Sequence, residues 1–130
     1  PATIPVTPIG EAATSGDWAL LVHGVTDPYG PPGNAGGHRA ILVDVEVTYS
    51  GQGTASLQTY GSFLLTDGGG VRSPGGVDVQ GMPSIGGPLA AGESRRAMVS
   101  FLVEAEITAG LQLALRPSPV DDPVVAVQIS

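Results

Sequence analysis

Residues 41–49 show the clearest alternation of apolar and polar positions in the chain. The apolar positions are Ile41, Val43, Val45, Val47 and Tyr49, and the polar ones are Asp44, Glu46 and Thr48, with Leu42 as the exception. A period of two predicts a strand with one buried face and one wet face. A long Gly/Pro-rich segment precedes it and Ser50-Gly51 follows it, so we expect a central strand bounded by a loop and a turn.

The same pattern recurs along the chain between Gly- and Pro-rich breakers. We expect further strands in residues 18–26, 57–66, 77–79, 95–103, 111–115 and 125–129. No dozen residues free of Gly and Pro carry a helical stripe, although residues 104–109 could form one helical turn. Seven or so short strands predict an all-β, antiparallel β-sandwich, with a β-barrel as the alternative.

The alternation also predicts the core and the domain limits. Residues 1–16 are a Pro/Thr-rich lead or linker that can add an edge strand, and residues 17–130 are the sandwich domain. The predicted core residues are Trp18, Leu20, Val22, Val43, Val45, Val47, Phe63, Leu65, Val99, Phe101, Leu113, Leu115 and Val127.

Composition narrows the function classes. The 130 residues fit one domain, and five basic residues against twelve acidic ones give a net charge of −7, with no lysine. An acidic chain without a basic stripe is a poor candidate for nucleic acid or anionic membranes. The absence of cysteine excludes disulfides, thiolate metal sites and a cysteine nucleophile. No apolar stretch reaches the ~20 residues of a membrane span.

Several motifs resemble a known family when taken in order. They are Trp18 at a strand start, the strand ending at Ser50-Gly51, Phe63-x-Leu65-x-Asp67-x-x-Gly70, Leu89-x-x-Gly92-Glu93, Val99-x-Phe101-x-Val103 and Leu113-x-Leu115. Over residues 17–129 the chain is similar to telokin-like, immunoglobulin-fold domains of secreted bacterial proteins, a family of unknown function related to a secreted mycobacterial immunogenic protein. The resemblance implies an immunoglobulin-like sandwich, often exported or lipid-anchored, with no known catalytic residues.

The compartment follows from the same resemblance and from the chain's start. Residues 1–8, Pro-Ala-Thr-Ile-Pro-Val-Thr-Pro, are typical of a stiff linker left after processing. We therefore expect an extracytoplasmic protein, either secreted or lipoprotein-anchored, with a signal or anchor before residue 1.

Two carboxylates on the opening strand raise the question of acid–base chemistry. Asp44 and Glu46 lie two residues apart on one face, about 7 Å apart, within the range of glycosidase carboxylate pairs. The other interpretation is a solvated outer face, paired with an arginine of a neighbouring strand, and we favour it. With no Gly-x-Ser-x-Gly elbow either, we predict no catalytic residues and a protein that is not an enzyme.

Metal binding is the alternative function that the sequence leaves open. His23, His38, Met82 and Met98 could supply copper ligands, but no His-x-His or His-x-Met pair concentrates them. We expect His23 to be a core or edge histidine and Met98 to be a packing residue. Calcium could be held by turn aspartates, namely Asp27, Asp67, Asp78, Asp121 and Asp122. Asp is also the ordinary turn former, so we predict no metal and no cofactor.

The leading prediction is a non-enzymatic binding or structural module whose partner is another protein or a cell-surface component. The candidate binding loop spans residues 27–39 and holds Tyr29, Asn34, His38 and Arg39 among residues that impose no regular structure. A homodimer through an edge strand is a further expectation, because residues 124–129 lack protective charge and would pair readily if they formed an edge.

Overall fold

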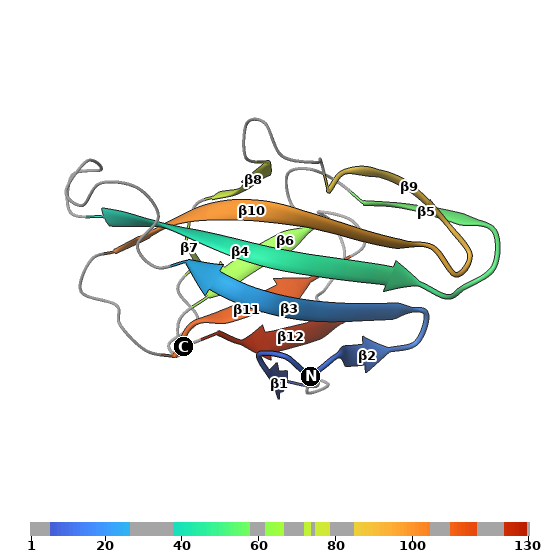
Figure 1. Cartoon of the computed structure of the whole chain (residues 1–130), viewed down its shortest axis with the longest axis horizontal. Helices are drawn as coiled ribbons and strands as arrows, with labels where there is room; N and C mark the ends of the chain where they lie inside the picture. Colours follow the sequence, from blue (N-terminus) through green and yellow to red (C-terminus); the bar gives the residue numbers. More distant parts are fainter. Residues whose placement is uncertain are drawn as a thin grey trace.

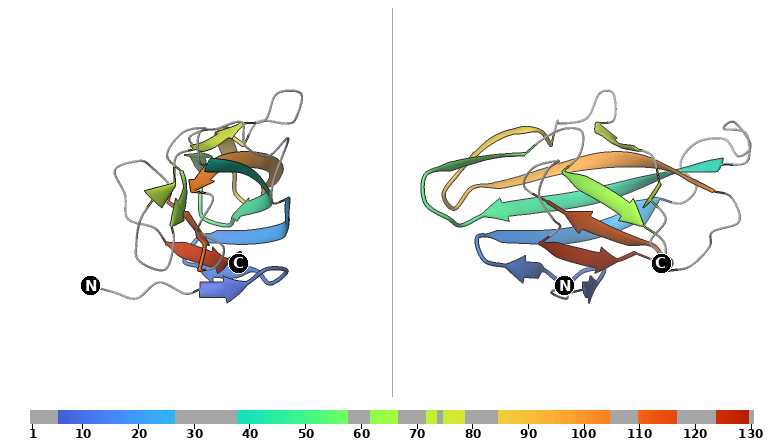
Figure 2. Two further views of the ribbon diagram at one scale, coloured as in Figure 1. Left: turned by 90° about the vertical axis from the view of Figure 1, so that its left-hand side faces the viewer. Right: turned by 180° about the vertical axis from the view of Figure 1, so that it is seen from behind.

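Two five-stranded sheets face each other in the computed structural model of the chain (Figures 1 and 2). The structure describes residues 6–26, 38–57, 62–66, 72–73, 75–78, 85–104, 110–116 and 124–129, with the backbone alone at 38–39, 72–73 and 75–78. All regular elements in these ranges are strands, and they are numbered β1 to β12. The predicted all-β sandwich is confirmed, because buried side chains of both sheets form one core.

The larger layer, which we call sheet 2, is built around the strand that opened the sequence analysis. It contains, in spatial order, β2 (Ala13–Ser15), β3 (Trp18–Thr26), β4 (His38–Tyr49), β10 (Ser94–Glu104) and β8 (Gly75–Asp78). β4 pairs with β10 from Thr48 opposite Ser94 to His38 opposite Glu104, without a shift in register. The prediction of a central strand is therefore confirmed, since β4 has a paired neighbour on each side.

The facing layer, sheet 1, is assembled mainly from the second half of the chain. It contains, in spatial order, β1 (Val6–Pro8), β12 (Val125–Gln128), β11 (Gln112–Leu115), β6 (Phe63–Thr66) and β7 (Arg72–Ser73). The β12–β11 and β11–β6 pairs are antiparallel, whereas β1 runs parallel to β12. In the view from behind, β6, β11 and β12 come to the front (Figure 2).

A two-stranded sheet extends one end of the molecule. β5 (Thr54–Leu57) and β9 (Gly87–Ala90) pair antiparallel and continue from β4 and into β10 (Figure 1). Arg95, at the start of β10, donates hydrogen bonds to the main-chain oxygens of Gly86, at 3.1 Å, and Pro88, at 2.7 Å. The guanidinium therefore fastens the entry of β9 to the end of sheet 2.

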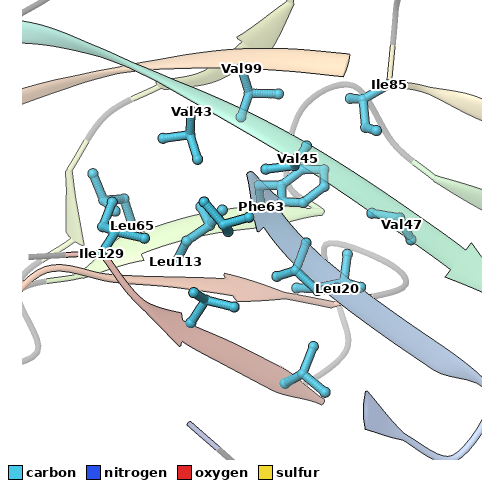
Figure 3. Close-up of a cluster of buried hydrophobic side chains, with 14 of the residues drawn as sticks. Leu20, Val43, Val45, Val47, Phe63, Leu65, Ile85, Val99, Leu113 and Ile129 are labelled. Carbon is cyan, nitrogen blue, oxygen red and sulfur yellow. The ribbon is translucent and has the colours of Figure 1, made fainter. Parts of the chain in front are cut away.

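The core lies between the two sheets and follows the predicted alternation. Every residue of the predicted core is buried, and Figure 3 shows ten of the buried side chains labelled, with Val43, Val45 and Leu113 among them. Ile41, Leu89, Leu111, Ile85 and Val125 are also fully or almost fully buried. Burying one such aliphatic side chain contributes about 1.5–3 kcal/mol, so this shared interior is the main stabilising feature of the fold.

An aromatic pair closes the sandwich where β3 begins and β4 ends. The rings of Trp18 and Tyr49 lie with centroids 5.0 Å apart at an interplanar angle of 46°. The Tyr49 hydroxyl donates to the Gln52 carbonyl at 2.8 Å, which holds the turn after β4. Gly51 lies in this turn, and a Cβ there would stand 2.5 Å from the Tyr49 hydroxyl oxygen, so the turn needs a residue without a side chain.

The described residues form more strands than the seven or so predicted from the sequence. The additional strands are short, for example β1, β2 and β7. Strands of two to four residues are too short for a period-two pattern to register, and hydrogen-bonded pairing with a neighbouring strand is what makes them strands. These short strands extend the two sheets, and the fold remains an all-β sandwich.

Candidate functional site

Four charged or titratable side chains meet on the outer face of sheet 2. His23 comes from β3, Asp44 and Glu46 from β4, and Arg96 from β10, so three adjacent strands contribute. We call these residues the outer-face charge group. All four point away from the core, because Val43, Val45 and Val47 occupy the inward parity of β4.

His23 lies on this face beside an irregularity in β3. Val22 lies opposite Val45 and Gly24 lies opposite the next residue, Asp44, so His23 is an extra residue, a β-bulge. The His23 Nε2 atom lies 2.8 Å from Glu46 Oε1. The prediction of a core position for His23 is therefore wrong, because Trp18, Leu20 and Val22 take the inward parity of β3 and His23 is exposed on the other side. The edge alternative fits better, since β2 pairs with β3 only at Trp18–Leu20.

Asp44 and Arg96 form the second pair of the group. Arg96 Nε donates to Asp44 Oδ1 at 3.1 Å, and Arg96 Nη2 donates to Asp44 Oδ2 at 2.8 Å. Arg96 lies directly opposite Glu46 in the ladder, so the guanidinium reaches Asp44 along the diagonal. A bidentate contact of this kind fixes the plane of the guanidinium relative to the plane of the carboxylate. The predicted wet face, paired with an arginine of a neighbouring strand, is confirmed at Asp44.

The pairing sets the protonation of Asp44. The hydrogen bond from Arg96 lowers the pKa of Asp44 below its ordinary value of 3.8, against the opposing effect of partial burial, and attraction to Arg96 and His23 adds to it. The same bond raises the pKa of Arg96 above its ordinary value. Asp44 is therefore ionised at neutral pH and cannot serve as the protonated acid that the glycosidase interpretation requires.

The outer face continues beyond the charge group as a polar row. The Thr48 and Ser94 hydroxyl oxygens lie 2.6 Å apart across the same β4–β10 pair. Thr48 and Ser94 are thus engaged with each other, as Asp44 is with Arg96 and His23 with Glu46. Such pairing holds the charges of these described residues in place.

The predicted binding loop is only partly within the described residues. Tyr29 and Asn34 lie outside them, as does the whole of residues 27–37. His38 and Arg39 are the first residues of β4, and their backbone pairs with Glu104 and Val103 of β10. The binding role of these four residues stays a prediction.

The metal hypotheses can be compared with the structure only at some of their positions. Within them, no three His, Asp or Glu side chains gather as a metal site would require. His23 contacts Glu46, and Met98 is half-buried on β10. Met82 and the aspartates Asp27, Asp67, Asp121 and Asp122 lie outside the described ranges, and Asp78 ends β8, so copper and calcium stay untested expectations at those positions.

The dimer expectation depended on residues 124–129 forming an edge. β12 lies between β1 and β11, and it is hydrogen-bonded on both sides. The condition is therefore not met while β1 pairs with β12, and a homodimer through an edge strand stays a prediction. Across the ranges that the structure describes, no helix is long and apolar enough to cross a membrane.

The fold and the paired outer face define a β-sandwich protein, and solved structures of the same architecture are known. The chain aligns with the yjhA protein of Bacillus subtilis at a TM-score of 0.72 and 18% identity, over 95% of this chain and 99% of that one. It aligns with MPT63, a secreted protein of Mycobacterium tuberculosis, at a TM-score of 0.68 and 12% identity, over 98% and 99% of the two chains.

A third similar structure belongs to a protein longer than this chain. The chain aligns with ycdA, a proposed lipoprotein of Bacillus subtilis, at a TM-score of 0.67 and 15% identity, over 91% of this chain but 37% of that one. No family model and no curated protein matches the chain. These identities establish a shared fold with bacterial β-sandwich proteins, and membership of the telokin-like family stays a prediction.

Proposed function

We propose that the chain is a non-enzymatic, extracytoplasmic binding or structural module of immunoglobulin-like type. The observation that carries the proposal is the outer-face charge group, in which each carboxylate has its own cationic or imidazole partner. A catalytic site would instead place a nucleophile, a base and an orienting group around an open position. A rigid sandwich with a satisfied surface suits recognition by its loops.

The extracytoplasmic assignment draws on two of the similar structures. MPT63 is secreted, and ycdA is a proposed lipoprotein. The absence of cysteine is compatible with export, because a sandwich with a continuous core does not depend on a disulfide. Expression of the full gene, followed by fractionation, tests the assignment, and recovery of the chain from the cytoplasm alone would contradict it.

The binding surface that we favour is the loop of residues 27–39. β3 ends at Thr26, opposite Leu42, and β4 begins at His38, opposite Glu104. The loop therefore joins two adjacent strands of sheet 2 at one end of the sandwich. Loops at a sandwich end are the usual recognition surface of this architecture, because the sheets hold them rigidly while leaving their sequence free.

An affinity-capture comparison tests whether the loop of residues 27–39 binds a partner. Immobilised wild-type protein and a Tyr29→Ala/Asn34→Ala/Arg39→Ala variant are exposed to bacterial cell-envelope fractions, and captured components are identified. We expect a component that the wild type retains and the variant loses. Gln52→Ala is the matched control, since Gln52 is exposed in the turn at the other end of β4. Retention of every component by the loop variant would reject the loop as the binding surface.

A further inference from the structure

The edge of β12 is covered by a strand that is poorly fitted to it. β1 has three residues, Val6–Pro8, and it pairs with β12 in parallel, with Val6 opposite Ala126 and Thr7 opposite Val127 (Figure 1). Val6 is 45% exposed, and Ile9, directly after β1, is 38% exposed. β1 thus buries no large apolar side chain, which is the usual anchor of an edge strand.

Thr7 makes the fit worse. Its position opposite the fully buried Val127 turns its side chain toward the interior. The Thr7 hydroxyl oxygen is buried and has no hydrogen-bond partner among the described residues. A buried hydroxyl without a partner loses its bond to water and gains nothing in return. β1 therefore occupies its place at a cost that a residue without the hydroxyl would avoid.

β12, in contrast, is firmly held without β1. Val125 and Val127 are fully buried, and Ala126 is 1% exposed. The antiparallel pairing with β11 runs from Val125 opposite Leu115 to Gln128 opposite Gln112, where the Gln112 and Gln128 side chains are hydrogen-bonded at 3.1 Å. β12 carries no charge along Val125–Gln128, so its free edge would accept another strand readily.

The connection after β1 gives it freedom to leave. The Gly10 amide donates to the Val22 carbonyl at 3.1 Å, which fastens the chain to β3 immediately after Ile9. Gly10 has a φ of 87°, a value that glycine adopts without strain. Residues before this point can detach while β2 keeps its pairing with β3.

We propose that β1 is a displaceable cover and that the edge of β12 is a strand-addition site for a partner polypeptide. The ligand is an extended, uncharged segment that runs parallel to β12 and places a β-branched apolar residue where Thr7 lies. Main-chain hydrogen bonds would supply affinity, and the inward position would supply selectivity. A valine there fills the space of Thr7 without burying a hydroxyl, so a partner strand that carries it pairs with β12 more favourably than β1 does and displaces β1 once its concentration offsets the tethering of β1.

Synthetic peptides test the proposal on the full chain. The probe is a fluorescent peptide with the sequence of residues 1–9 and valine in place of Thr7, and its binding is followed by anisotropy. Peptides with the native threonine and with aspartate at that position are compared with it. We expect the valine peptide to bind about tenfold more tightly than the threonine peptide. The aspartate peptide should not bind.

A disulfide that holds β1 on β12 tests whether the peptide binds at the edge of β12. Val6→Cys/Ala126→Cys joins register partners in a chain that has no other cysteine, so oxidation gives one defined disulfide. The oxidised variant should lose peptide binding, and reduction should restore it. Thr7→Val in the chain, a second variant that improves the resident strand, should weaken binding of the valine peptide about tenfold.

Three results would overturn the proposal. They are no binding of the valine peptide at millimolar concentration, equal binding to the oxidised Val6→Cys/Ala126→Cys variant, and concentration-dependent dimers of the wild type without peptide, which would assign the edge to a second copy. The experiment is independent of the loop at residues 27–39, so its failure leaves the proposed function standing.

Discussion

The β4–β10 pair and the β1–β12 pair each join two strands from distant parts of the chain, but they stabilise the fold in different ways. β4 and β10 keep one register along their whole contact and turn Val43, Val99 and Phe101 into the core. β1 contributes three residues and one inward side chain, a threonine whose hydroxyl has no hydrogen-bond partner in the part of the chain that the structure describes. Hydrogen-bonded pairing alone therefore does not decide how firmly a strand is held, and inward apolar side chains do.

The strongest test of this contrast removes one large side chain from each pair. Phe101→Ala should lower the free energy of unfolding by about 3–5 kcal/mol, because Phe101 is 2% exposed and its loss leaves a cavity. Val6→Ala in β1 should change it by less than about 0.5 kcal/mol. Urea unfolding of both variants measures the difference, and similar losses would contradict the contrast.

The next largest loss of stability is expected in the turn that follows β4. Gly51→Ala should destabilise the protein by about 1–3 kcal/mol, since the new Cβ would meet the Tyr49 hydroxyl oxygen at 2.5 Å and the Tyr49 ring is packed against Trp18. Gly24→Ala is the matched control, because a Cβ there meets nothing within 4 Å. If thermal melting shows the same change for both variants, the turn is not the tight point that the geometry describes.

A substitution in β1 should stabilise the protein, in contrast to the two destabilising changes above. Thr7→Val is expected to stabilise the pairing with β12 by about 1 kcal/mol, because it removes a buried hydroxyl that has no partner among the described residues. Amide hydrogen exchange at Ala126 and Gln128 should slow in the variant, because the amides of this parity face β1, whereas that of Ile129 bonds to Leu111 on the β11 side. Exchange in β10 should not change, and faster exchange at Ala126 and Gln128 would show that the hydroxyl has a favourable contact.

The smallest effect concerns the charges on the β4–β10 pair. The pKa of Asp44 is lowered in the folded protein by the hydrogen bond from Arg96, so the unfolded chain binds this proton more readily. The pair therefore stabilises the fold above the ordinary pKa of 3.8 and loses its contribution as the pH falls through the lowered value. The stability difference between wild type and Asp44→Asn should shrink between about pH 5 and pH 2.

Arg96→Gln is the companion variant for this measurement. At neutral pH it should lose about as much stability as Asp44→Asn does. The double variant should lose no more stability than the two single variants lose together, because both single changes remove the same interaction. A difference that grows on acidification would reverse the assigned sign.

Local alternation predicted what depends on local pattern. Val43, Val45 and Val47 face inward because a strand turns every second side chain to the same side, and no knowledge of the partner strand is needed. The interpretation of Asp44 succeeded for the same reason, because it lies on the other parity. Local pattern left open whether residues 124–129 form an edge, because that depends on β1, which lies more than a hundred residues away in sequence.

His23 shows a different limit. Its neighbours Leu21 and Val22 suggested an interior position, but Trp18, Leu20 and Val22 take the inward parity, so His23 falls on the outer one. What a strict period of two cannot contain is the bulge between Val22 and Gly24. The sequence does hold a signal for it. Val22 and Val25 both pack toward the core although they lie three residues apart, a spacing that requires one extra residue between them.

That extra residue behaves as a phase shift in the strand. Val22 lies opposite Val45 and Val25 lies opposite Val43, so the bulge returns the second valine to the inner side after an odd number of steps. A chain lacking Gly24 would have the same two valines in simple alternation, with His23 on the outer parity between them. The core valines thus set the register of β3, and the strand accommodates one surplus residue without disturbing the pairing on either side of it.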